Sequence, residues 1–161
     1  MKTVAKILSL IFLMALNHAY AQLEPVGKDK VALGGYDVVA YFKAGKGVKG
    51  IPEINTVHNG VIYHFSTIEN KNAFTKKPEG FLPQYDGYCA LAIGAQNKKV
   101  TINPETFKIT NGKLYMFYNG KFPLGRGTFN SIEPWIKDED NLIKKADANW
   151  PTLKSSKRHT K

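Results

Sequence analysis

Two Asn-Gly pairs, each flanked by β-rich segments, constrain the fold of this chain more than any other sequence feature. The flanking segments are residues 54–58 and 61–65 around Asn59-Gly60, and residues 107–110 and 114–118 around Asn111-Gly112. Both residues of an Asn-Gly pair tolerate positive φ, which a two-residue hairpin turn requires. The sequence therefore predicts two antiparallel β-hairpins.

Helices are predicted between the hairpins and after them. Ser66 and Glu69 have the spacing of a capping box, which predicts a helix that begins at Ser66 and stops before Pro78. Asp37 is placed to cap a short helical turn. Two further helices are expected over residues 87–95 and from Ser131 to residues 149–151. Because the strands pair locally rather than alternating with crossover helices, we predict an α+β fold, with a small antiparallel sheet built from two hairpins and packed with about three helices.

The first twenty-one residues have the layout of a secretory signal peptide. Lys2 and Lys6 precede the apolar run Ile7–Leu16, and small residues occupy the positions that signal peptidase reads before the cleavage point. The alternative, a membrane anchor, needs about 20 apolar residues, whereas this run has about ten. We therefore predict cleavage after Ala21 and export to the periplasm or the exterior, with no transmembrane segment in the mature chain.

The mature chain is predicted to hold one domain. Composition divides it into an N-terminal leader (22–33), a domain (34–151) and a basic flexible tail (152–161). Removal of Lys2 and Lys6 lowers the formal net charge from +10 to +8, and the tail carries four of the remaining positive charges. Half of the excess charge thus lies in the tail, and we expect no nucleic-acid partner for an exported chain. The sequence leaves the oligomeric state open.

The single cysteine, Cys89, admits two interpretations. One thiol excludes a disulfide within the chain, and no Cys-x-x-Cys motif is present. Cys89 stands near the start of a predicted helix, where the helix dipole favours a thiolate that could bind Cu(I). Its neighbours Ala90, Ala92 and Ile93 fit the alternative, a small buried apolar residue.

The chain has none of the common catalytic motifs. A Gly-rich phosphate loop, a Gly-x-Ser-x-Gly elbow and a His-Glu-x-x-His helix are all missing from the sequence. The sequence therefore does not predict an enzyme.

Six short segments follow one another in a recognisable order. They are GYDVVAYF (35–42), YHFS (63–66), PQYDGYCA (83–90), NPETF (103–107), GKLYMFYN (112–119) and KADANWP (145–151). In this order and spacing they resemble the exported, single-domain proteins of the YHS domain family. The resemblance covers about residues 34–151.

The resemblance implies a role in metal handling. YHS domains occur in copper-transporting ATPases, and are suspected of binding heavy metals such as copper. The family members that are best suited to bind a metal carry two cysteines near the start of a helix. The resemblance places these two positions at Ser66 and Asn70, so this chain lacks both thiolates. Cys89 remains as the predicted metal anchor and His64 as a second ligand, since two ligands suffice for linear Cu(I).

Three functional hypotheses follow. The first is an exported YHS-domain binding protein whose ligand is a heavy metal such as copper, held by Cys89 and His64. The alternative is a metal-free small-ligand or protein-interaction module, in which tyrosines and Trp135 line a cleft. The third is a thiol enzyme in which Cys89 is the nucleophile and His64 or His58 the base.

Overall fold

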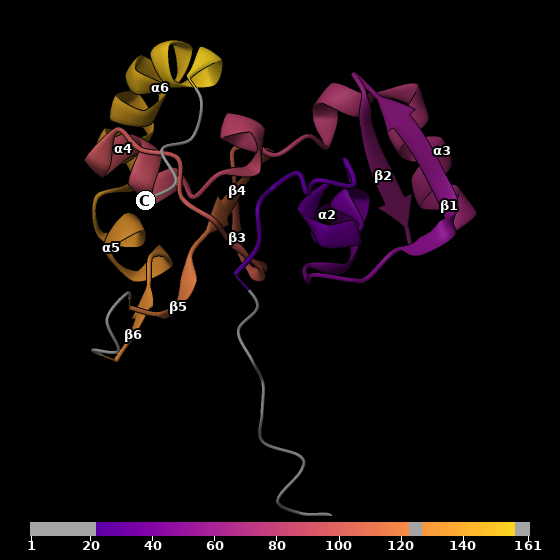
Figure 1. Cartoon of the computed structure of the whole chain (residues 1–161), viewed down its shortest axis with the longest axis horizontal. Coiled ribbons are helices and arrows are strands. Elements are labelled where there is room, and N and C mark those ends of the chain that lie inside the picture. Colours follow the sequence, from indigo (N-terminus) through magenta and orange to yellow (C-terminus); the bar gives the residue numbers. More distant parts are fainter. Residues whose placement is uncertain (1–21, 123–126, 157–161) are drawn as a thin grey trace, which may run out of the picture.

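The computed structural model of the chain describes residues 22–122 and 127–156 (Figure 1). The predicted signal peptide lies outside the described residues. The leader begins the described part, and Leu23 forms two backbone hydrogen bonds with Ile102, of 2.9 and 3.0 Å. These bonds attach the leader to the chain just before the second hairpin.

The strands form three antiparallel hairpins, each a separate two-stranded sheet. They are β1 (Ile51–His58) with β2 (Val61–Phe65), β3 (Asn103–Thr110) with β4 (Lys113–Phe117), and β5 (Asn119–Lys121) with β6 (Thr128–Asn130). The two predicted hairpins are confirmed, because Asn59 and Asn111 have φ values of 50° and 52° and each is followed by a glycine with positive φ. The third hairpin was not predicted, since its strands have only three residues each.

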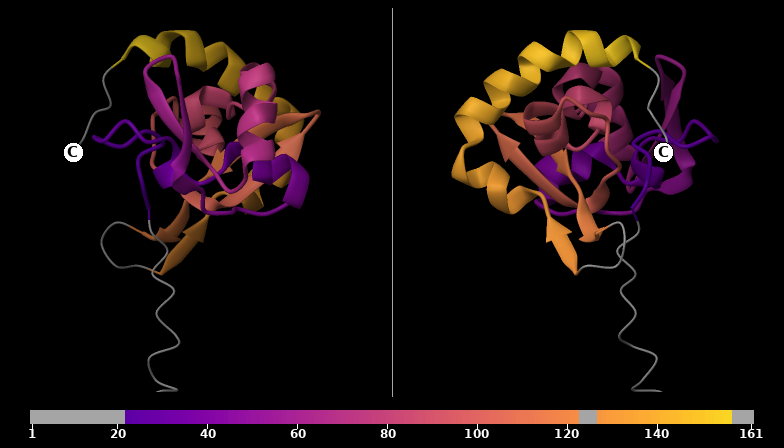
Figure 2. Two further views of the ribbon diagram at one scale, coloured as in Figure 1. Left: turned by 90° about the vertical axis from the view of Figure 1, so that its right-hand side faces the viewer. Right: turned by 60° about the vertical axis from the view of Figure 1, so that its left-hand side comes forward.

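Helices pack around these hairpins, and the predicted α+β fold is confirmed. The helices are α2 (Val38–Ala44), α3 (Ile68–Lys76), α4 (Ala90–Gln96), α5 (Ile132–Lys137) and α6 (Glu139–Ser155), with 3-10 turns η2 (Leu33–Gly35), η3 (Pro78–Gly80) and η4 (Gln84–Gly87). Figure 1 shows β1, β2 and α3 at one end of the molecule, α4 to α6 at the other, and β3–β4 between them. In Figure 2, α6 arches along the outside of its end of the molecule.

The predicted capping box at Ser66 is wrong by one residue. Thr67 is the N-cap of α3, and its side chain accepts a hydrogen bond of 3.1 Å from the backbone N–H of Asn70. Ser66 uses its hydroxyl elsewhere, as a donor to the carboxylate of Asp37. The cap at Asp37 is confirmed, because its carboxylate accepts from the first backbone N–H groups of α2.

The helix predicted over residues 87–95 begins at Ala90 instead. Tyr85, Asp86 and Gly87 all have positive φ, at 56°, 50° and 83°, and form the turn η4 rather than a helical turn. Cys89 consequently lies at the N-cap position of α4. Two non-glycine residues in a row with left-handed backbone are unusual, and sequence pattern alone did not indicate them.

The predicted C-terminal helix is two helices. The backbone breaks at Asp138, whose φ of −145° is not helical, so α5 ends before it and α6 begins after it. The predicted end at residues 149–151 is wrong, because α6 continues through Pro151 to Ser155. The Lys99 ammonium donates to the backbone carbonyl of Ser156 at 2.7 Å, which places a cation at the negative end of this helix.

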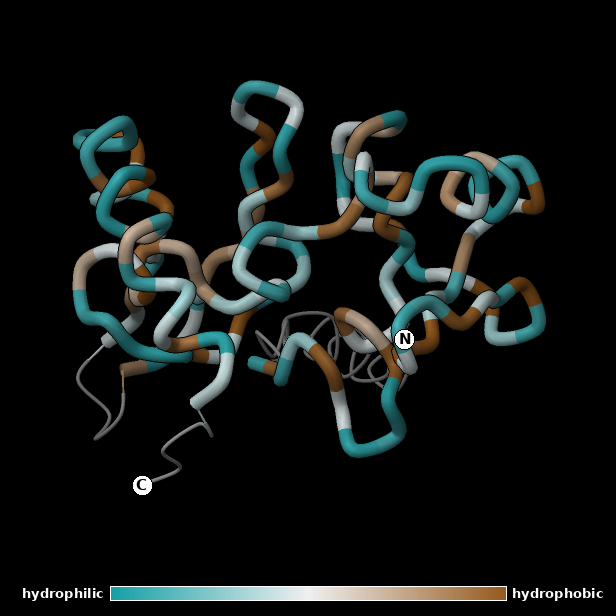
Figure 3. The backbone as a smooth tube through the Cα atoms, turned by 90° about the horizontal axis from the view of Figure 1, so that it is seen from above, coloured by the Kyte–Doolittle hydropathy of each residue, from teal (hydrophilic) through white to brown (hydrophobic). Residues whose placement is uncertain are grey.

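The core is a single cluster of buried side chains that joins the hairpins to the helices. Its largest fully buried members are Trp135, Tyr41, Tyr115, Phe65, Phe74 and Phe117. Met116 is also fully buried. Hydropathy alternates along the helices and strands (Figure 3), and no described helix is long and apolar enough to cross a membrane.

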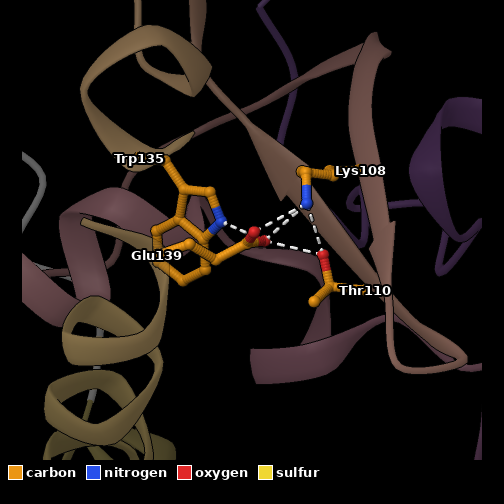
Figure 4. A network of polar contacts seen from close by, with 4 residues as sticks. All are labelled: Lys108, Thr110, Trp135 and Glu139. Carbon is orange, nitrogen blue, oxygen red and sulfur yellow. Dashed lines mark hydrogen bonds and ion pairs between the residues drawn. The ribbon is translucent and has the colours of Figure 1, made fainter. Parts of the chain in front are cut away.

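A charged hydrogen-bond network joins the start of α6 to the second hairpin (Figure 4). The Glu139 carboxylate accepts from the Lys108 ammonium at 2.6 Å and from the Trp135 indole N–H at 3.0 Å. It also accepts from the Thr110 hydroxyl at 2.6 Å. Burial opposes ionisation of Glu139, but the three donors outweigh it and hold the pKa of this carboxyl below its ordinary value of 4.5.

Glu139→Gln is expected to remove a pH-dependent part of the stability. Because the pKa of Glu139 is lower in the folded state, its contribution is complete above pH 4.5 and is lost as the pH falls through the folded-state pKa. We expect the variant to be less stable than the wild type by about 1 kcal/mol near pH 7, and we expect this difference to shrink steadily as the pH falls below 4.5. Urea unfolding at pH 7 and at a series of pH values below 4.5, followed by Trp fluorescence, measures this. A difference that stays constant with pH would contradict the prediction.

Candidate functional site

The two predicted metal ligands lie at opposite ends of the molecule. Cys89 precedes α4 and His64 lies in β2, and Figure 1 shows these elements far apart. His64 lies opposite Asn55 in the strand register and packs against Gly35. His58 lies opposite Val61, so the two histidines do not face each other across the hairpin. The structure does not bring Cys89 together with either histidine.

Ser66 and Asn70, where the predicted resemblance to YHS domains would place two cysteines, surround a buried carboxylate. Asp37 is fully buried and its Oδ2 atom accepts from the Ser66 hydroxyl and the Asn70 amide, each at 2.7 Å, and from the Ser66 backbone N–H at 2.8 Å. Its Oδ1 atom accepts from the backbone N–H groups of Val39 and Ala40 at the start of α2. The carboxylate thus ties the start of α2 to the junction between β2 and α3.

This polar cluster is not built to hold a metal. Both oxygens of Asp37 are occupied by hydrogen bonds. The Lys43 ammonium donates to Oδ1 of Asn70 at 3.1 Å, so a positive charge stands beside the cluster and would repel a cation. Within residues 22–122 and 127–156, no three His, Cys, Asp or Glu side chains gather into a group that could hold a metal ion.

Cys89 is 1% exposed and hydrogen-bonded. Its Sγ atom lies 3.3 Å from the Ser131 hydroxyl oxygen, and that hydroxyl lies 2.9 Å from the Tyr118 carbonyl oxygen. Because a hydroxyl has one proton, and the carbonyl can only accept, the Ser131 proton is directed to Tyr118 and the Cys89 thiol donates to Ser131. The buried Cys89 sulfur therefore has the Ser131 hydroxyl as its hydrogen-bond partner.

A predominantly apolar pocket of about 340 Å³ opens beside Cys89. We call it the Cys89 pocket, and it is lined by Cys89, Leu91, Ala92, Gln96, Val100, Tyr118, Phe122, Phe129 and Ser131. Phe122 and Phe129 form one wall, with ring centroids 5.2 Å apart. The thiol and the Ser131 hydroxyl are the polar groups at its inner side, and both residues are 1% exposed. Such an apolar lining with few polar groups is typical of small-molecule sites.

Cys89 is expected to react slowly in the native protein, because only 1% of the residue is exposed. Alkylation with iodoacetamide should be at least about ten-fold faster in denaturant, where the thiol has ordinary access to solvent. A timed alkylation pulse followed by mass spectrometry measures both rates. Equal rates would show that the thiol is reached freely from the pocket.

The sequence missed most of the Cys89 pocket. Ser131 was predicted as a helix cap, but it makes no capping bond and its hydroxyl faces Cys89 instead. Trp135, predicted to line a cleft, is fully buried, and its indole N–H donates to Glu139. Of the tyrosines, Tyr118 lines this pocket. No local signal marks these residues, since they come together from α4, β5–β6 and the chain between them.

Comparisons of the chain with protein-family models, with curated proteins and with solved structures find no match. The resemblance to the YHS domain family therefore remains a prediction that rests on the sequence motifs.

Proposed function

We propose that this chain is an exported binding protein that holds a small apolar molecule in the Cys89 pocket. The observation that carries the proposal is the pocket itself, with about 340 Å³ and walls formed by Phe122, Phe129 and Leu91. Its volume lies within the range of roughly 300–1,000 Å³ that small-molecule sites occupy. Export is inferred from the predicted signal peptide.

Three features favour an apolar ligand over a copper ion at this site. His64 is too remote to be a second ligand for Cys89. The Cys89 residue is 1% exposed and its sulfur already contacts the Ser131 hydroxyl at 3.3 Å, which leaves little access for a metal ion. Among the described residues, no charged side chain lines the pocket, so a neutral or weakly polar molecule would lose little hydration energy on entering it.

The proposal is tested with N-phenyl-1-naphthylamine, an uncharged apolar dye that becomes fluorescent when it leaves water. We expect saturable binding to the mature wild-type protein, and dye that is bound should slow alkylation of Cys89. Phe129→Ala removes one wall of the pocket and is expected to weaken dye binding by about ten-fold, as the loss of part of a ring contact implies.

A matched control and a competing ligand complete the experiment. Ile68→Ala changes an exposed apolar residue, 52% accessible and outside the pocket, and should leave dye binding unchanged. Dye binding that is equal in Phe129→Ala and the wild type, or that leaves Cys89 alkylation unaffected, would contradict the proposal. A stoichiometric Cu(I) complex that Cys89→Ala abolishes would instead support the copper hypothesis.

A further inference from the structure

A second pocket, of about 310 Å³, lies where the leader meets the first hairpin. We call it the leader pocket, and it is lined by Pro25, Val26, Ala32, Leu33, His58, Asn59, Val61, Tyr63, Leu82, Pro83, Asp86 and Lys154. It shares no residue with the Cys89 pocket. Five segments build it: the leader, the β1–β2 hairpin, the loop after α3, the turn η4 and the end of α6.

The Tyr63 side chain lines the leader pocket, and its hydroxyl has hydrogen-bonding capacity that no described residue uses. Tyr63 is 8% exposed, and its hydroxyl makes no hydrogen bond within the described residues. Its ring packs on Phe74, at 4.8 Å between centroids, so the side chain is held in place. Burial and the nearby Asp86 carboxylate raise the pKa of Tyr63 to about 12, which keeps the hydroxyl protonated. The hydroxyl is therefore available to donate to a ligand that enters the pocket and displaces water.

Two opposite charges line the same pocket. They are the Asp86 carboxylate and the Lys154 ammonium, and neither side chain belongs to an ion pair in the described part of the chain. His58 and Asn59 add a polar edge, with His58 Nε2 3.1 Å from the Asn59 amide nitrogen. Apart from Tyr63, the remaining lining residues are apolar.

Backbone strain is concentrated at this pocket. Leu33 and Asp86 have φ values of 46° and 50°, in a region that costs an ordinary residue about 1–3 kcal/mol. Gly34, Gly35 and Gly87, next to them, also have positive φ. Such strain persists only where the surrounding structure maintains it, and it is common at ligand-binding sites. Here it places the Leu33 side chain and the Asp86 carboxylate on the pocket.

We propose that the leader pocket binds a small zwitterion with an apolar side chain, a molecule of the α-amino acid class. Its ammonium pairs with Asp86, its carboxylate pairs with Lys154, and its apolar side chain packs on Leu33 and Val61. The Tyr63 hydroxyl supplies a further hydrogen bond. This arrangement uses both unpaired charges and the apolar lining, whereas a purely apolar or singly charged ligand would leave at least one charge unused.

Calorimetry with L-leucine and L-phenylalanine tests this proposal on the mature full-length protein. Asp86→Asn is the key variant, because asparagine tolerates the left-handed backbone at this position and so preserves the turn. We expect Asp86→Asn and Lys154→Gln each to weaken binding of the amino acids by about ten-fold, as the loss of one ionic contact implies. The exposed residues Asp140 and Lys144, changed to Asn and Gln, serve as controls and should leave binding unchanged.

Two single-charge probes assign the orientation. Binding of 3-methylbutylamine should fall in Asp86→Asn and not in Lys154→Gln, whereas binding of 4-methylpentanoate should show the reverse. Phe129→Ala changes the Cys89 pocket and should leave L-leucine binding unchanged. The two proposals are therefore tested independently of each other. The proposal is overturned if neither amino acid binds the wild type, or if both charge variants bind the amino acids as tightly as the wild type does.

Discussion

Asp37→Asn is expected to lower the free energy of unfolding by about 3 kcal/mol, because it replaces a buried carboxylate that accepts five hydrogen bonds. The carboxylate accepts through both oxygens, whereas an amide of the same shape accepts through only one. In either amide orientation, an NH₂ group would face N–H or O–H donors at the start of α2 or at Ser66 and Asn70. The junction between α2, β2 and α3 would thus contain unsatisfied buried donors.

Urea unfolding of Asp37→Asn and the wild type measures this change. Asp140→Asn is the matched control, since Asp140 is exposed in the first turn of α6 and should change stability by less than about 0.5 kcal/mol. An equal effect in the two variants would show that the Asp37 carboxylate is not the structural centre of this junction.

Gly94→Ala is expected to destabilise the protein by about 2 kcal/mol, although alanine favours helices more than glycine does. A Cβ atom at Gly94 would lie 2.7 Å from the backbone carbonyl oxygen of Leu142 in α6. That oxygen belongs to a helix backbone, so the contact is relieved only if α4 and α6 move apart. The movement would also strain the bond of 2.8 Å that the Asn149 amide donates to the Ile93 carbonyl.

Gly80→Ala provides the control for this substitution. A Cβ atom at Gly80 meets only the flexible side chain of Lys77, at 3.6 Å, so the change should alter stability by less than about 1 kcal/mol in either direction. Thermal or urea unfolding of both variants separates the close packing of two helices from a general effect of replacing glycine. A Gly94→Ala protein as stable as the wild type would contradict the close approach of α4 and α6.

Local sequence determined the two Asn-Gly hairpins, the cap at Asp37 and the α+β class. An Asn-Gly turn needs only two residues with positive φ and flanking strands, so neighbouring residues contain nearly all the information. The same holds for Asp37, which caps α2 through backbone groups two and three residues away. These contacts form within a few residues of each other, and for that reason the sequence pattern predicted them.

Tertiary structure decided how the polar and reactive side chains are used. Ser66 lost its predicted capping role because the buried Asp37 carboxylate, 29 residues away in sequence, offered its hydroxyl a stronger acceptor. Cys89 and His64 were separated because α4 and β2 pack at opposite ends of the molecule. The left-handed backbone at Tyr85 likewise has no local cause in residue type. Packing between distant segments therefore placed the candidate binding sites. Burial and charge pairing depend on which groups lie close together in space and not on their separation along the chain.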